Sequence, residues 1–264
     1  MKTTLSSLKI PVIYAYPRSG GTLVNRCLGS ISGNLILSEV NPLASVSPIA
    51  EQAQHWLNLL TEDHLAEFVQ KPYGQQITHL ATMAKELNHH LIIRDWTAAN
   101  FIDNPISDNI LTPSFLLEQD LYLSHYGLTC LPVVIARRVA DVYESMNRTF
   151  PHLNLEIQSF GEAYLAFAQA VCDYPVFQYE QICQDPTTQI PWICETLEIN
   201  YDTDFLNKFY HFENCTGDNT IEQSSRGRQL TEIKLFPSHT ESECYKIASN
   251  DQNCQKADQL LGYE

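Results

Sequence analysis

Short apolar runs alternate with amphipathic stretches along most of this chain. Five of the runs are apolar on both faces, which is typical of strands buried on both sides of a parallel sheet. They cover residues 11–16, 34–40, 91–95, 132–136 and 175–179. The stretches with helical periodicity cover residues 21–31, 48–60, 62–70, 76–87, 140–147 and 157–172. This alternation predicts a three-layer α/β fold, in which helices cover both faces of a central parallel sheet.

The length of 264 residues is in the range of one α/β domain with insertions, so we expect residues 1–264 to form a single domain. Residues 42–90 exceed what one crossover between strands needs, and their periodicity predicts a helical insertion that caps a substrate cleft. Residues 216–237 are polar and rich in Asn, Ser, Thr and Gln, which indicates a long loop. A helix over about residues 241–261 is expected to close the chain.

The chain is acidic, with a net charge of −15. Surfaces that bind nucleic acid are normally basic, so this charge argues against a nucleic-acid partner. No stretch reaches the roughly 18 consecutive apolar residues of a membrane helix, and the first residues lack the apolar core of a signal peptide. We therefore expect a cytoplasmic protein without stable membrane insertion. The eight cysteines form no C-x-x-C pair and no tight cluster, which favours free thiols over disulfides or a zinc site.

A loop of small residues directly follows the first predicted strand. The segment AYPRSGGT, residues 15–22, lies on the frame G-x-x-x-x-G-K-[ST] of phosphate-binding loops. Ala15 takes the place of the first glycine, and Gly21 takes the place of the lysine that reaches the β- and γ-phosphates of a nucleoside triphosphate. A later predicted strand ends in Arg137 and Arg138, and not in a carboxylate that could hold magnesium. The pattern therefore argues against ATP hydrolysis.

The loop nevertheless retains the groups that bind an anion. Between a strand and a helix, successive N–H groups point into one concavity, and the helix start adds partial positive charge. Gly20 and Gly21 let the backbone approach an anion closely. Ser19 and Thr22 add hydroxyl donors, and Arg18 offers a guanidinium group that can bind two oxygens. The alternative is that the two glycines make only a tight turn.

A second group of cationic residues follows the fourth predicted strand. Arg137 stands at the end of that strand, on the side where open α/β sheets bind ligands, and Ser145 lies eight residues later. Arg137 and Arg138 oppose the dipole of the helix that follows, which argues against a purely structural role at its N-terminus. Two more arginines flank a glycine at residues 226–228.

In chain order, these motifs resemble the sulfotransferases that use 3′-phosphoadenosine 5′-phosphosulfate (PAPS). The 5′-phosphosulfate loop of that family is similar to Y-P-[KR]-S-G-[ST]-T. Residues 16–22, YPRSGGT, match it, with Gly21 where a hydroxyl residue is frequent. The 3′-phosphate site of the family has an arginine at a strand end and a serine eight positions later. Arg137 and Ser145 have this spacing, with Val139 in place of a common proline.

Two further elements extend the resemblance over nearly the whole chain. The family has a Y-E-x-[IL]-x-x-[DN]-P element, and QYEQICQDP at residues 178–186 resembles it. The family also has a basic, glycine-containing loop that closes on the 3′-phosphate, and SSRGRQ at residues 224–229 is similar to its bacterial version.

The resemblance implies a P-loop-like fold and the transfer of a sulfuryl group from PAPS to an acceptor oxygen or nitrogen, with PAP as the second product and without a metal ion. It implies that Arg18 and the N–H groups of residues 19–22 stabilise the charge that develops on the leaving phosphate, which makes Arg18 a catalytic residue. The cofactor-binding residues that it implies are Arg18, Ser19, Gly20, Gly21, Thr22, Arg137, Ser145, Arg226, Gly227 and Arg228.

The general base is the part of the family pattern that this chain does not repeat. Many members carry a histidine just after the third strand, in a K-T-H-like segment that corresponds to LIIRDW at residues 91–96. Arg94 corresponds to the lysine and Trp96 to the histidine, so Asp95 is the first candidate for the catalytic base. Asp95 could instead cap a helix or pair with Arg94, and Trp96 could line the acceptor pocket. The reserve candidates are His89, His90 and His125.

Two other functions stay open at this point. One is a P-loop nucleotide or small-molecule kinase, which the missing lysine disfavours. The other is a non-catalytic, nucleotide-binding member of the same fold, which the missing histidine allows. For a sulfotransferase, the expected acceptor is a small molecule, a glycan or a lipid, and the sequence does not specify which.

Overall fold

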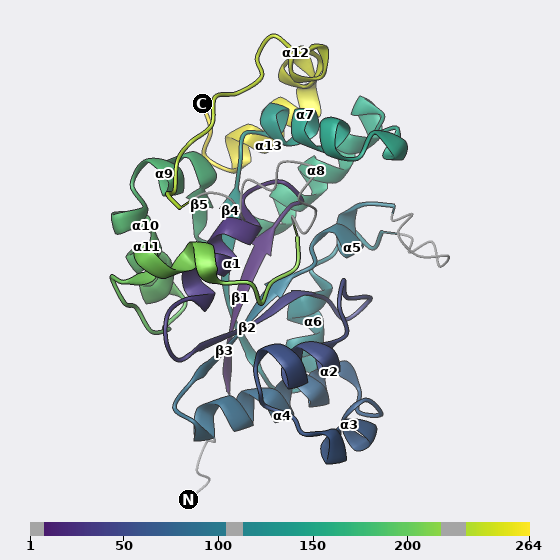
Figure 1. Ribbon diagram of the computed structural model, residues 1–264. Helices are drawn as coiled ribbons and strands as arrows, with labels where there is room; N and C mark the ends of the chain where they lie inside the picture. The colour runs from purple at the N-terminus through teal and green to yellow at the C-terminus, as the bar shows by residue number, and fades with distance from the viewer. Residues whose placement is uncertain (1–7, 104–112, 218–230) are drawn as a thin grey trace, which may run out of the picture.

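The computed structural model describes residues 8–103, 113–217 and 231–264, and Figure 1 shows their arrangement. Within these residues the chain forms a five-stranded parallel sheet in the order β2-β3-β1-β4-β5. The strands are β1 (Lys9–Ala15), β2 (Asn34–Val40), β3 (His90–Asp95), β4 (Thr129–Ala136) and β5 (Val176–Gln178). All five predicted strands are therefore confirmed, with small shifts at their ends.

Side chains alternate between the two faces of the sheet, so the strands contribute to two separate hydrophobic cores. In β1, Val12 and Tyr14 face one core, while Ile13 and Ala15 face the other. Six consecutive residues of β1 are buried, as expected for the central strand of a sheet that is covered on both faces. Burial on both faces explains why this strand is a continuous apolar run in the sequence.

Helices cover both faces of the sheet. On the face that carries Ile13, the helices that contribute to the core are α1 (Gly21–Gly29), α10 (Pro186–Thr196) and α11 (Phe205–Lys208). On the other face, the helices of the larger core include α4 (Tyr73–Glu86), α7 (Val139–Thr149), α8 (Ile157–Val171) and α13 (Gln252–Leu260). The predicted three-layer α/β architecture is therefore confirmed.

The chain between β2 and β3 is helical, as predicted for residues 42–90. It forms α2 (Ile49–Glu51), which continues as the π-helix η1 (Gln52–Trp56), and then α3 (Glu62–Phe68) and α4. Figure 1 places α3 and α4 near the end of the sheet where β1 begins. Substrate clefts of open α/β sheets lie at the opposite, carboxyl edge of the strands, and the cap over such a cleft stays a prediction.

The predicted helix over residues 241–261 is two helices, α12 (Glu243–Asn250) and α13. Asp251 lies between them with extended backbone, and its side chain accepts hydrogen bonds from the N–H groups of Asn253 and Cys254. Because aspartate is a strong N-cap, it starts a new helix within the polar run at residues 249–253. Other helical segments are α5 (Ala98–Phe101), α6 (Glu118–His125), η2 (Pro151–Leu153), α9 (Tyr179–Gln184) and η3 (Phe209–His211).

The predicted loop at residues 216–237 is described in part. Residues 216–217 and 231–237 contain no helix or strand, as predicted. Arg226, Gly227 and Arg228 lie outside the described residues. In the ranges that the structure describes, every helix is too short or too polar to cross a membrane.

Candidate functional site

The order of the strands gathers the predicted site at one edge of the sheet. β1 lies between β3 and β4 and is parallel to both, so the carboxyl ends of the three strands meet there. β1 leads into the loop at residues 16–20, β3 ends at Asp95, and β4 is followed by Arg137. The loop, the candidate base and the candidate 3′-phosphate arginine therefore come from adjacent strands.

The loop after β1 turns the chain tightly into α1. Arg18 and Gly20 have left-handed backbone, with φ angles of 70° and 97°. The Ser19 N–H donates to the Tyr16 carbonyl oxygen at 3.1 Å, and no side chain caps the start of α1. The first N–H groups of an α-helix have no acceptor inside the helix, so this uncapped start presents donors and partial positive charge to an anion.

Both glycines of the loop are also required by the space around them. A Cβ atom on Gly20 would lie 2.4 Å from Tyr179 Cδ2, and one on Gly21 would lie 2.9 Å from the Ala15 Cβ atom. Carbon atoms cannot approach each other this closely without a shift of the structure. The tight-turn role of the glycines and an anion-binding role are thus compatible.

The two phosphate-site motifs predicted from the sequence lie side by side. Arg18 Nε donates to Ser145 Oγ at 3.1 Å, and Arg137 Nη1 donates to the Arg18 carbonyl oxygen at 3.3 Å. The Arg137 guanidinium group also lies over the ring of Tyr179, 5.1 Å from its centroid. α7 begins at Val139, directly after the two arginines, and carries Ser145 to the loop. The fold thus brings together Arg18, Arg137 and Ser145, which are far apart in the sequence.

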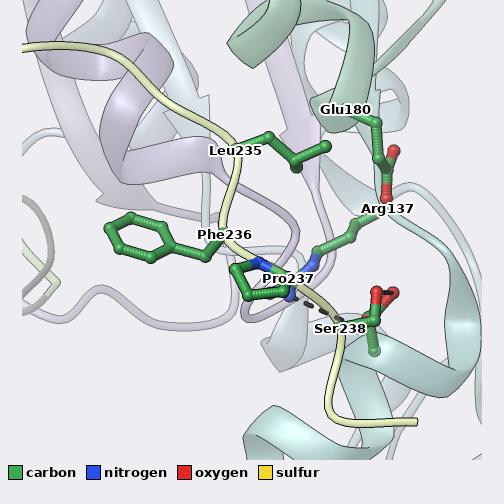
Figure 2. Close-up of a pocket in the computed structure, with 7 residues that line it drawn as sticks. Arg137, Glu180, Leu235, Phe236, Pro237 and Ser238 are labelled. Atoms are coloured by element: carbon green, nitrogen blue, oxygen red, sulfur yellow. Dashed lines mark hydrogen bonds and ion pairs between the residues drawn. The ribbon is translucent and has the colours of Figure 1, made fainter.

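A pocket of about 350 Å³ lies beside Arg137 (Figure 2). Its walls are Arg137, Asp141, Glu180 and residues 235–238. Asp141 Oδ1 lies 3.7 Å from Arg137 Nη2, and Asp141 Oδ2 accepts a hydrogen bond from Ser238 Oγ at 2.9 Å. Residues 235–238 therefore return to Arg137 after the predicted basic loop. The two carboxylates make the pocket less positive than Arg137 alone would.

Asp95 lies at the end of β3 and is only 2% exposed. Its Oδ1 atom accepts a hydrogen bond from Asn41 Nδ2 at 2.9 Å, and its Oδ2 atom accepts one from Thr97 Oγ1 at 3.0 Å. Burial raises the pKa of Asp95 to about 7, although these two hydrogen bonds oppose the shift. A carboxyl group with this pKa can exchange a proton near neutral pH, as a general base must.

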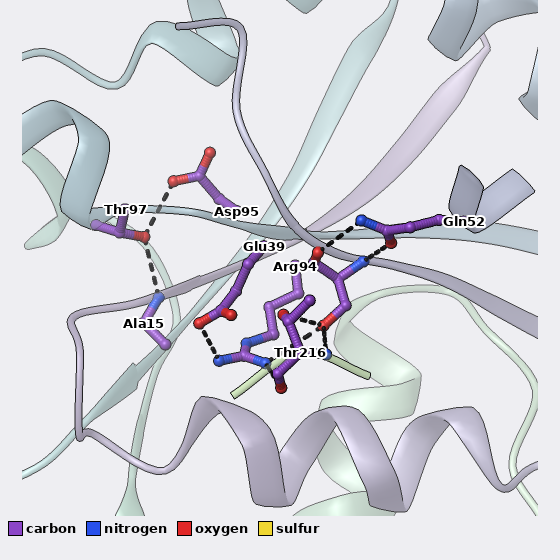
Figure 3. A network of polar contacts seen from close by, with 8 residues as sticks. Ala15, Glu39, Gln52, Arg94, Asp95, Thr97 and Thr216 are labelled. Carbon is purple, nitrogen blue, oxygen red and sulfur yellow. Dashed lines mark hydrogen bonds and ion pairs between the residues drawn. The ribbon is translucent and has the colours of Figure 1, made fainter. Parts of the chain in front are cut away.

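The alternative roles considered for Asp95 are not seen in the structure. Successive side chains of a strand point to opposite faces, and Figure 3 shows Asp95 directed toward Thr97 and Arg94 toward Thr216. Arg94 Nη2 pairs instead with Glu39 Oε1 at 2.7 Å. The residue at the N-cap position of α5 is Thr97, not Asp95.

Glu39 is a second candidate for the general base, and the sequence patterns did not reveal it. β2 is irregular between Ser38 and Val40, and Glu39 has left-handed backbone there, with a φ angle of 51°. A bulge of this kind re-aims a side chain, and this one directs the carboxylate toward Arg94. The Glu39 side chain is 18% exposed, so it is more accessible than Asp95. The one sequence signal for Glu39 as a site residue was its position near the carboxyl end of a predicted strand.

The reserve histidines lie away from this edge. His89 precedes β3 and His90 begins it, so both lie at the amino-terminal edge of the sheet. His125 ends α6 shortly before β4 begins, at the same edge. Trp96 directly follows β3, and its N–H donates to the Val40 carbonyl oxygen at 3.2 Å. The structure therefore brings Trp96, but none of these histidines, to the candidate site.

All eight cysteines are free thiols. Burial raises the pKa of Cys183 to about 11 and that of Cys194 to about 12, so these two groups stay protonated at neutral pH. Among the described residues, no group of His, Cys, Asp and Glu side chains is arranged to hold a metal ion.

No protein-family model matches this chain, and no curated protein matches it in sequence. Solved structures do match it. The sulfotransferase domain from the Synechococcus PCC 7002 olefin synthase has a TM-score of 0.62 and 16% identity, over 100% of this chain and 98% of that chain. The sulfotransferase domain from the curacin biosynthetic pathway has a TM-score of 0.58 and 14% identity, over 98% and 99% of the two chains. This chain has the fold of these sulfotransferase domains.

Proposed function

We propose that this chain is a sulfotransferase that transfers a sulfuryl group from PAPS to a hydroxyl or amine of an acceptor and releases PAP. One observation carries the proposal: Arg18, Arg137 and Ser145 meet beside the uncapped start of α1. PAPS is anionic at both the 5′ and the 3′ position of its ribose, and this arrangement offers donors for both groups. The fold that the chain shares with two sulfotransferase domains supports the proposal.

The loop between β1 and α1 fits a 5′-phosphosulfate group. The start of α1 favours an anion through its free N–H groups and its dipole, and the Ser19 and Thr22 hydroxyls and the Arg18 guanidinium group add donors. PAPS supplies the sulfuryl group and an anionic leaving group. Arg18 and the N–H groups of residues 20–22 hold that leaving group and stabilise the charge that it gains as the bond from sulfur to the bridging oxygen breaks, while the Ser19 N–H keeps its hydrogen bond to the Tyr16 carbonyl oxygen.

Arg137 and Ser145 are proposed to bind the 3′-phosphate, the group that distinguishes PAPS from other adenine nucleotides. Ser145 accepts a hydrogen bond from Arg18, so one hydroxyl connects the two phosphate sites. Asp141 and Glu180 line the pocket beside Arg137 and oppose a second negative charge. The basic residues at positions 226–228 are therefore proposed to supply the remaining positive charge.

Asp95 is proposed as the general base that takes the proton of the acceptor when the acceptor atom bonds to sulfur. Its pKa of about 7 suits this role near neutral pH. Glu39 is a second carboxylate near the same edge, and it is compared with Asp95 in the Discussion. We further propose that residues 1–264 act as one domain in the cytoplasm, on an acceptor that is a small molecule, a glycan or a lipid.

Calorimetry with PAP, AMP and ATP, with and without magnesium, tests the proposal. We expect PAP to bind without magnesium and to bind more tightly than AMP and ATP. A preference for ATP with magnesium would contradict it and would favour a kinase. Gly21 stands at the position of the lysine that reaches the phosphates of a nucleoside triphosphate, and even a Cβ atom there would lie 3.1 Å from Arg94 Nε. PAP binding without turnover of any acceptor in a broad screen would favour a non-catalytic nucleotide-binding protein.

A further inference from the structure

A buried hydroxyl lies at the centre of a polar network between β2, β3 and the residues that follow η3. Ser38 is 0% exposed. Its Oγ atom accepts hydrogen bonds from the Thr216 N–H at 3.0 Å and from Arg94 Nη1 at 3.4 Å, and it lies 2.9 Å from Thr216 Oγ1. A serine hydroxyl has one donor and two acceptor sites, so these three contacts saturate it.

The network fixes Thr216 through all of its polar groups. Its N–H and its hydroxyl contact Ser38, and its carbonyl oxygen accepts a hydrogen bond from Arg94 Nη1 at 3.2 Å (Figure 3). Thr216 is 3% exposed. A chain segment outside regular secondary structure is seldom fixed at so many points, and here the fixed residue belongs to the polar segment that the sequence predicted as a loop.

The residue after this anchor lies directly against the phosphosulfate loop. Gly217 has left-handed backbone with a φ angle of 97°, and a Cβ atom there would lie 2.4 Å from Thr22 Oγ1. From the other side, Arg94 Nε lies 3.1 Å from the position of a Cβ atom on Gly21. The network therefore contacts the start of α1 at two successive residues.

Ser38 itself is held in place from the edge of the sheet. β2 is an edge strand, and its free N–H and carbonyl groups would otherwise lack partners. Gln52 in η1 is the hydrogen-bond partner of both backbone groups of Ser38. Its Oε1 accepts from the Ser38 N–H at 2.7 Å, and its Nε2 donates to the Ser38 carbonyl oxygen at 3.0 Å. Gln52 is fully buried, and π-helical turns such as η1 are frequent at functional sites.

We infer that Ser38 is a positioning residue for the phosphosulfate loop: through Thr216, Gly217 and Arg94 it holds Gly21 and Thr22 in the geometry that binds the anion. This inference deepens the proposed function and rests on it for the identity of the anion. Because the donor and acceptor sites of the Ser38 hydroxyl are all occupied by Thr216 and Arg94, its effect on binding passes through these neighbours.

The first test needs no ligand. Hydrogen–deuterium exchange is compared between the wild-type protein, Ser38→Ala and the control Ser242→Ala, which removes a serine that accepts from the Tyr245 N–H at 3.1 Å in α12. We expect Ser38→Ala to speed exchange by about tenfold, the effect of one net hydrogen bond, in the peptide covering residues 20–28, whose hydrogen-bonded amides begin with the Val24 N–H that donates to the Gly20 carbonyl oxygen at 3.2 Å. The control should leave this peptide unchanged. An unchanged peptide in a folded Ser38→Ala protein would overturn the inference.

The second test measures binding of PAP by calorimetry. We expect Ser38→Ala to weaken PAP binding by about tenfold, and Thr216→Val, which removes one hydroxyl contact, to weaken it by a smaller factor. If Ser38→Ala does not fold, Thr216→Val replaces it in both tests. A folded Thr216→Val protein with wild-type PAP affinity and wild-type exchange would then overturn the inference.

The two tests separate this inference from the proposed function. If the wild-type protein does not bind PAP, the proposed function fails, while the exchange experiment still decides the role of Ser38. If the wild-type protein binds PAP but Ser38→Ala changes neither exchange nor affinity, the inference fails and the proposed function stands.

Discussion

Replacing Arg137 with alanine should separate the binding of PAP from that of AMP. The two nucleotides differ by the 3′-phosphate, and Arg137 is the residue that we propose for it. Its side chain is 11% exposed, so solvent screens a contact with a phosphate only weakly. Asp141 Oδ1, at 3.7 Å from Arg137 Nη2, offsets part of the positive charge.

The size of the effect follows from these contacts. A hydrogen bond to a charged group contributes about 1.5–3 kcal/mol, and the nearby carboxylate reduces the contribution of Arg137 toward the lower end of this range. We therefore expect Arg137→Ala to weaken PAP binding by about 10- to 100-fold and AMP binding by less than about threefold. Calorimetry of PAP and of AMP with the wild-type protein and with Arg137→Ala measures these factors directly.

The neighbouring arginine provides a matched control. Arg138 lies over the ring of Tyr263, 5.1 Å from its centroid, and its Nη1 donates to the Glu264 carbonyl oxygen at 3.4 Å. Arg138→Ala removes the same charge one residue away, and it should leave both affinities within about threefold of the wild type. Equal losses of PAP and AMP binding in Arg137→Ala, or the same loss of PAP binding in Arg138→Ala, would refute a specific 3′-phosphate role.

Further predictions concern the candidate base and the loop. Asp95→Asn should lower turnover at least about 100-fold and leave PAP affinity unchanged, whereas Glu39→Gln should have the smaller effect on turnover; the reverse order would make Glu39 the base. Because a protonated carboxyl group cannot accept a proton, wild-type turnover should fall as the pH drops below about 7, and a profile that is flat from pH 6 to pH 8 would contradict this role. Because of the raised pKa, folded Asp95 holds its proton between about pH 4 and pH 7, whereas the unfolded chain releases it. The contribution of Asp95 to the free energy of unfolding therefore falls as the pH rises through that window, and urea denaturation of Asp95→Asn should lack this trend. Gly20→Ala should lower the free energy of unfolding by about 2 kcal/mol or more, from left-handed strain and contact with Tyr179, and a loss below about 0.5 kcal/mol would show that the loop adapts.

The layers of the fold follow from local patterns that the sequence displays directly. Residues 10–15 in β1 and 133–136 in β4 are buried and form unbroken apolar runs. The loop at residues 16–20 is recognisable because a tight strand-to-helix turn needs Gly20 and Gly21. Arg137 and Ser145 could be singled out by their spacing, and the structure places both beside Arg18. Their roles in binding PAPS stay predictions.

Other features depend on contacts that no local pattern contains. Arg94 precedes Asp95 in the sequence, yet it pairs with Glu39 from the neighbouring strand, because successive side chains of β3 point to opposite faces. The left-handed backbone at Glu39 arises from a register shift between β2 and β3. Asp251 divides the last helix by capping α13, in the middle of the polar run at residues 249–253.

The most direct test of the proposed function is a crystal structure of this chain with PAP. We expect the 3′-phosphate within hydrogen-bond distance of Arg137 and Ser145, and the 5′-phosphate on the N–H groups at the start of α1 with Arg18 beside it. PAP bound elsewhere, or bound at the loop with its 3′-phosphate in solvent, would contradict the account.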